Sequence, residues 1–191
     1  MIRSLSRIVA VVFFLGAAAL AGPQSASAQE KVMGTEVIDP GIQVDVIAAP
    51  KDAVTPKEQH LSESKTDIHF EVLARWSPDE AVAVPAGAER GGFVGFLNMF
   101  AKITNEETGR TIEATLVPHI NLSDNMHYAR NVSLPGAADD RYTVELFVEP
   151  PQKLDMSFHR DWREEYGNQL FEAQSFTYTG VQMADIVAAT R

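Results

Sequence analysis

Short runs in which apolar and polar residues alternate limit the possible folds of this sequence more than any other feature. A period of two is typical of a strand that has one buried face. The sequence shows no sustained helical period and no internal repeat. We therefore predict an all-β fold, an immunoglobulin-like antiparallel β-sandwich of about seven strands. The expected strands are residues 41–48, 67–75, 93–104, 110–117, 141–148 and 171–179, with a shorter run near 131–134.

Turn residues separate these runs. The segment from Asn105 to Gly109 joins two strand-like runs and predicts a hairpin. Residues 51–65 and 78–92 lack periodicity and are predicted loops. Tyr142 opens a late strand, so it is either a corner tyrosine whose hydroxyl bonds back to the backbone or an ordinary strand tyrosine.

Residues 1–28 have the pattern of a secretory signal peptide. Arg3 and Arg7 precede an apolar run over residues 8–21, and the small residues Ala, Ser and Ala follow at 26–28. The apolar run is too short for a transmembrane helix, which needs about 20 residues. We expect a mature chain that begins at Gln29 and is exported without membrane insertion.

Cysteine content and charge exclude several classes of function. The chain has no cysteine, so it can form neither a disulfide, a thiolate zinc site nor a blue-copper centre. Its formal net charge of −10 argues against binding to nucleic acid, whose phosphates require a basic surface. Neither a nucleophile elbow nor a phosphate-binding loop is present. We therefore predict a binding protein and not an enzyme.

Four of the five histidines fall in three segments that could bind a metal ion together. His69 and Glu71 are two residues apart in a predicted strand, so both lie on the face opposite the apolar one. His119 and His127 lie in a second segment, and His159 lies in a third. If the three segments converge, four imidazoles and a carboxylate would surround one ion, a donor set that suits copper, zinc, iron or nickel. Each histidine alone is more often a surface side chain or a hydrogen-bonded one.

The segment 117–128, which contains His119 and His127, is predicted to be a loop because Pro118 interrupts the preceding strand. Met126 lies in the same segment, and a thioether would favour copper(I). His60 lies in a polar loop and is predicted to be an ordinary loop histidine.

The order of these motifs resembles the FetP-like family of periplasmic iron-transport proteins. The resemblance is carried by Ile-His-Phe-Glu at 68–71, Val-Pro-His at 117–119, Asp-Asn-Met-His-Tyr at 124–128 and the strand at 142–151, and it covers nearly the whole mature chain. It implies soluble, usually dimeric, immunoglobulin-like periplasmic proteins that bind copper through His, Met and Glu. It also implies that they assist an inner-membrane iron permease, and that iron or manganese can occupy the same region.

The resemblance assigns metal ligands residue by residue. His69 and Glu71 match the family's His-x-Glu motif, His127 matches its His-Tyr motif, and His159 matches a histidine of the late loop. His119 occupies a position where family members have a methionine. Exchange of a thioether for an imidazole should favour copper(II), or zinc if redox chemistry is absent, over copper(I). Whether His159 would reach the ion within one subunit or across a dimer is left open.

The sequence thus predicts a signal peptide over residues 1–28 and a single metal-binding β-sandwich domain over residues 29–191. The predicted function is a periplasmic, homodimeric protein that binds copper, and also iron, manganese or zinc, and assists an inner-membrane iron permease. The alternative is a periplasmic copper or zinc chaperone or storage module that is not linked to iron transport.

Overall fold

The computed structural model describes residues 30–189, which form eight strands and a few short helices. The predicted signal peptide lies outside the described residues. No helix between residues 30 and 189 is long and apolar enough to cross a membrane. The strands are β1 Lys31–Ile38, β2 Ile42–Pro50, β3 Ile68–Trp76, β4 Asn98–Asn105, β5 Thr111–Asn121, β6 Asn125–Val132, β7 Arg141–Glu149 and β8 Gln174–Gln182; the helices are the 3-10 turn Glu63–Lys65, α1 Arg160–Glu165 and α2 Ala184–Ala188.

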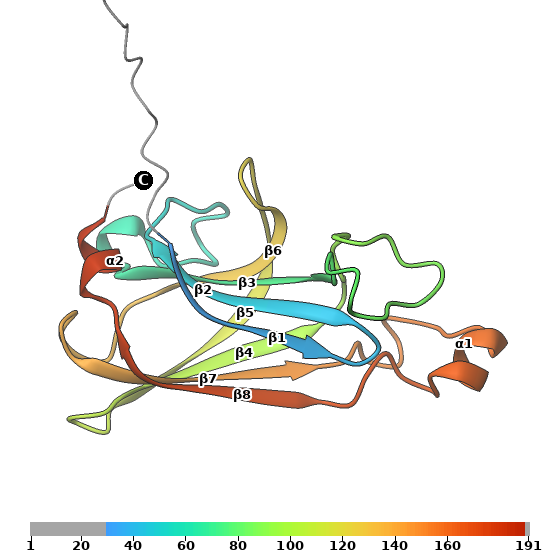
Figure 1. The fold of residues 1–191 in the computed structure, drawn as a ribbon. Helices are drawn as coiled ribbons and strands as arrows, with labels where there is room; N and C mark the ends of the chain where they lie inside the picture. Colours follow the sequence, from blue (N-terminus) through green and yellow to red (C-terminus); the bar gives the residue numbers. More distant parts are fainter. Residues whose placement is uncertain (1–29, 190–191) are drawn as a thin grey trace, which may run out of the picture.

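All neighbouring strands are antiparallel and follow the order β1-β2-β3-β6-β5-β4-β7-β8. The long strand β5 connects the two halves of this order. Its residues 111–116 pair with β4, and its residues 117–121 pair with β6. In Figure 1, β1, β2 and β3 lie over β4, β7 and β8, and the apolar faces of the two layers enclose the core.

The two ends of the strand order approach each other, so the sheet is nearly closed. Gly34 of β1 lies against the ring of Tyr178 of β8, where any Cβ atom would collide with that ring. The Tyr178 hydroxyl donates to Glu36 Oε1 at 3.2 Å. The predicted all-β antiparallel fold is confirmed in this nearly closed form, whereas the immunoglobulin-like arrangement stays a prediction.

The alternating runs form strands with one face in the core, as expected. Ile68, Phe70 and Val72 of β3 are fully buried between the layers. The hydroxyl of Tyr142 donates to the carbonyl oxygen of Ala137 at 2.6 Å, five residues upstream. Tyr142 is therefore a corner tyrosine, whose hydroxyl bonds back to the backbone, and not an ordinary strand tyrosine.

The predicted loop over residues 117–128 is wrong, because this segment is mostly a β-hairpin. Strand β5 continues through Pro118 to Asn121, and β6 begins at Asn125. Proline is tolerated there because the pairing of β5 with β4 ends at Leu116, which leaves β5 without a neighbour on that side.

Two other strands differ from the prediction. Strand β1 was not predicted, because its alternation is interrupted by a register shift between Val32 and Gly34. The predicted strand 93–104 begins only at Asn98, since Phe96 adopts a left-handed conformation with φ 64°.

The side chain of Tyr128 provides a test of this packing. The residue is 1% exposed, its hydroxyl donates to Val94 O at 2.9 Å, and that hydroxyl accepts from Leu97 N at 3.0 Å. Tyr128→Phe should lower the free energy of unfolding by about 1–3 kcal/mol, because a buried N–H and a buried carbonyl lose their partner. Urea unfolding measures this change. Tyr166→Phe, at an exposed tyrosine, should change stability by less than about 0.5 kcal/mol, and equal losses in both variants would contradict the role of Tyr128.

Candidate metal centre

Strand β3 places His69 and Glu71 on the face of the sheet opposite the core, as the period of two predicted. Both are nevertheless buried, with exposures of 2% and 0%. The β2–β3 loop (residues 51–67) lies over His69. His69 Nε2 is 3.8 Å from Glu71 Oε1.

The β5–β6 hairpin adds two more imidazoles to this face. His119 and His127 are directly opposite each other in the hairpin. Residue Asn131, which shares a face of β6 with His127, is the direct neighbour of His69. As a result, one ring nitrogen from each of His69, His119 and His127 lies within 4.8 Å of the others. The structure therefore brings together three of the four predicted histidines.

Hydrogen bonds set which nitrogen of two rings can bind a metal. The Nδ2 group of Asn131 donates to two backbone carbonyls, so its Oδ1 faces His69 Nδ1 at 2.7 Å and accepts a hydrogen bond from the N–H at that position. His127 Nδ1 donates to the Asn125 carbonyl oxygen at 3.0 Å. Both rings therefore carry their lone pair on Nε2. Partners of this kind orient metal-binding histidines and fix their tautomer.

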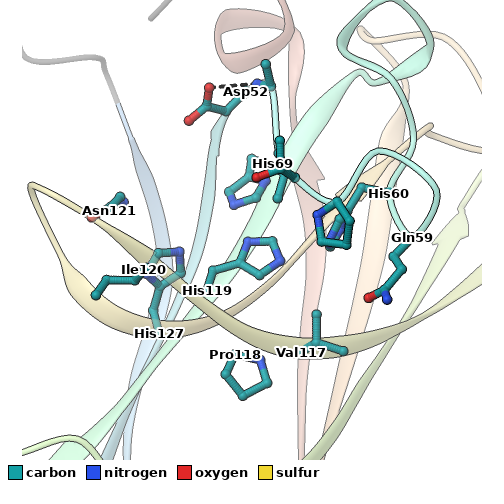
Figure 2. A pocket seen from close by; sticks show the side chains of 14 residues that line it. Asp52, Gln59, His60, His69, Val117, Pro118, His119, Ile120, Asn121 and His127 are labelled. Atoms are coloured by element: carbon teal, nitrogen blue, oxygen red, sulfur yellow. Dashed lines mark hydrogen bonds between the residues drawn. The ribbon is translucent and has the colours of Figure 1, made fainter.

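The three histidines line a cavity of about 400 Å³ under the β2–β3 loop. His60 of that loop also lines the cavity and lies beside His119 (Figure 2). The ring centroids of His60 and His119 are 4.9 Å apart. The prediction of an ordinary loop position for His60 missed this placement, and no pattern in the sequence pointed to it.

The environment of His119 and His60 favours the neutral imidazole, which is the form that binds metals. Burial lowers the pKa of His119 to about 4, with further contributions from His69, His60, His127 and Arg130. Burial also lowers the pKa of His60, and the charge of Arg130 adds to this effect. The Nε2 atom of His119 is buried without a hydrogen-bond partner in the described part of the chain. This orphaned acceptor suits a metal ligand.

Glu71 belongs to a second, adjoining group of ligands. One carboxylate oxygen from each of Glu30, Glu71 and Asp124 lies within 4.8 Å of the others. The sequence prediction did not include Glu30 and Asp124. Asp124 precedes His127 by three residues in the hairpin turn, which was a usable signal, whereas Glu30 precedes the unpredicted strand β1.

The remaining predicted donors lie elsewhere. His159 is exposed and directly precedes α1. In Figure 1, α1 lies apart from β6 and its hairpin. His159 is not part of the histidine group of this single chain, so its role as a ligand stays a prediction that concerns a dimer. Met126 is paired with Ile120, on the opposite face of the hairpin from the histidines. Met156 packs against the core.

A comparison with protein families decides the classification of the chain. The model of the family described as "Fe2+ transport protein" matches residues 27–183. The chain belongs to this iron-transport family. The match covers every strand and all the residues of the candidate centre. No curated protein gives a significant match.

Solved structures with the same fold include copper-binding relatives. A copper-bound variant of P19 from Campylobacter jejuni has a TM-score of 0.66 and 20% identity, over 85% of this chain and 100% of that one. A copper-bound variant of FetP from uropathogenic Escherichia coli has a TM-score of 0.63 and 21% identity, over 79% of this chain and 95% of that one. At these identities the likeness shows the shared fold.

The lowered pKa of His119 predicts how the stability of the metal-free protein depends on pH. Between about pH 6.5 and about pH 4, the unfolded chain binds a proton at this residue and the folded chain does not. Stability should therefore fall as the pH decreases through this window. Urea unfolding at about pH 7 and about pH 5 measures the loss, which should be smaller in His119→Asn because that side chain cannot titrate. The same loss in both proteins would contradict a lowered pKa.

Proposed function

We propose that this chain is a periplasmic metal-binding protein that holds copper(II) through His69, His119 and His127 and assists iron uptake. The observation that carries the proposal is the convergence of three imidazole nitrogens within 4.8 Å at a cavity under the β2–β3 loop. Glu71, with an oxygen 3.8 Å from His69 Nε2, offers a carboxylate donor beside this group. A binding role and not an enzymatic one fits a site without a nucleophile.

The donor set favours copper(II) over copper(I). All three nitrogen donors are borderline imidazoles, and the thioether of Met126 faces the other side of the hairpin. For the same nitrogen ligands, first-row divalent ions bind in an order that peaks at copper(II). The copper bound to P19 and FetP variants of the same fold supports this choice.

The carboxylate group supports the link to iron. Oxygen donors suit harder ions, and Glu30, Glu71 and Asp124 offer three carboxylates beside the histidines. We propose that iron(II), or manganese(II), occupies this group next to copper. The membership of the chain in a family of Fe2+ transport proteins supports the same assignment.

The proposed setting follows from the sequence and the family together. The signal peptide over residues 1–28 would export one metal-binding domain, residues 29–191, of the immunoglobulin-like type to the periplasm. There the protein would act as a homodimer and deliver iron to an inner-membrane permease. The predicted alternative is a copper or zinc chaperone or storage module that is not linked to iron transport.

Competition between metals tests the choice of ion. Metal-free protein titrated with copper(II) in the presence of zinc should bind copper(II) more tightly, because the donors are imidazoles in a preformed group. His69→Ala should weaken copper(II) binding by about 10-fold or more, since it removes a ligand whose orientation is already fixed. The matched control Ser64→Ala changes an exposed residue of the β2–β3 loop and should bind like the wild type. Tighter binding of zinc than of copper(II) would contradict the proposed ion.

Growth under iron limitation tests the iron function. A deletion strain should grow poorly when iron is scarce, the wild-type gene should restore growth, and a His69→Ala, His127→Ala double variant should not. The Ser64→Ala variant should restore growth as a control for expression. A deletion strain that grows normally without iron and fails only under copper stress would support the chaperone alternative instead.

A further inference from the structure

The β2–β3 loop brings a fourth histidine to the metal centre. His60 lines the same cavity as His69, His119 and His127 (Figure 2). Its ring meets the ring of His119 nearly edge-on, with an interplanar angle of 79° and a centroid distance of 4.9 Å. His60 lies outside the group of three nitrogens that are within 4.8 Å of one another.

The backbone on both sides of His60 is attached to β6, the strand that carries His127. Arg130 donates to the carbonyl oxygen of Gln59 at 2.8 Å. Asn131 Nδ2 donates to the carbonyl oxygen of Leu61 at 3.0 Å and to that of Asp52 at 2.9 Å. The loop thus holds its histidine over the cavity by contacts with residues that neighbour the centre.

The unsatisfied nitrogen of His60 indicates a ligand. Its Nδ1 atom is buried and has no hydrogen-bond partner among residues 30–189, as is also true of Nε2 of the adjacent His119. If these two rings were packed only for their apolar surface, His60 Nδ1 and His119 Nε2 would both stay without a hydrogen bond, at a cost in stability. A metal ion between the loop and the strands would satisfy both atoms at once.

We propose that His60 is a fourth imidazole ligand, which the β2–β3 loop contributes through Nδ1 when copper(II) is bound by the three strand histidines. This inference rests on the proposed function and extends it. The loop would move so that His60 Nδ1 joins the group of three, from a starting point where its ring centroid is 4.9 Å from that of His119. Four nitrogen donors match the tetragonal coordination that copper(II) prefers, and the loop then covers the ion.

Electron paramagnetic resonance of the copper(II)-loaded full-length mature protein tests this assignment. The wild-type spectrum should show hyperfine coupling from four nitrogens, and the His60→Ala spectrum should show three. Dissociation of copper to a chelator should be about 10-fold faster in His60→Ala, because the loop no longer holds the ion. Circular dichroism checks that the variant is folded, and Ser64→Ala in the same loop should match the wild type.

The outcomes separate this inference from the proposed function. If His60→Ala has the wild-type spectrum and dissociation rate while His69→Ala loses copper, the fourth ligand is excluded and the three-histidine centre stands. If the wild type binds no copper(II), both are overturned. A folded His60→Ala protein that has lost one nitrogen coupling supports the assignment.

Discussion

The metal centre depends on the side chain of Asn131, which connects a strand, a ring and a loop. Its amide group donates to the carbonyl oxygens of Asp52 and Leu61 and so holds the β2–β3 loop in place. These two bonds turn Oδ1 toward His69, where it can only accept a hydrogen bond from Nδ1–H, so the lone pair of that ring lies on Nε2. One buried amide therefore sets the metal-binding atom of a strand histidine and the position of the loop that covers it.

The path of β5 explains why histidines that are distant in the sequence meet. The strand leaves β4 after Leu116 and pairs with β6, so the hairpin that carries His119 and His127 is aligned with β3. Since side chains alternate along each strand, a single register places all three histidines on the face away from the core. The carboxylates of Glu30, Glu71 and Asp124 gather beside them. The same arrangement thus supplies nitrogen donors for copper and oxygen donors for a harder ion.

Alternation in the sequence was sufficient to predict an all-β chain and the common face of His69 and Glu71. It could not predict strand β1, where a bulge breaks the period, or β6, whose polar side chains face a covered site and resemble a loop. The family resemblance pointed to His119 and His127 as candidate ligands. The strand pairing that places the two residues opposite each other depends on the tertiary structure. His60 escaped prediction because its position depends on contacts with Arg130 and Asn131, about 70 residues later in the chain.

The central claim is that three histidines of the sheet form one copper(II) site. Anomalous diffraction from crystals of the copper-loaded mature protein, recorded at the copper absorption edge, tests it most directly. The account predicts a peak within bonding distance, about 2 Å, of Nε2 of both His69 and His127 and of a ring nitrogen of His119. A peak at another place in the molecule, with no copper between these three rings, would contradict it.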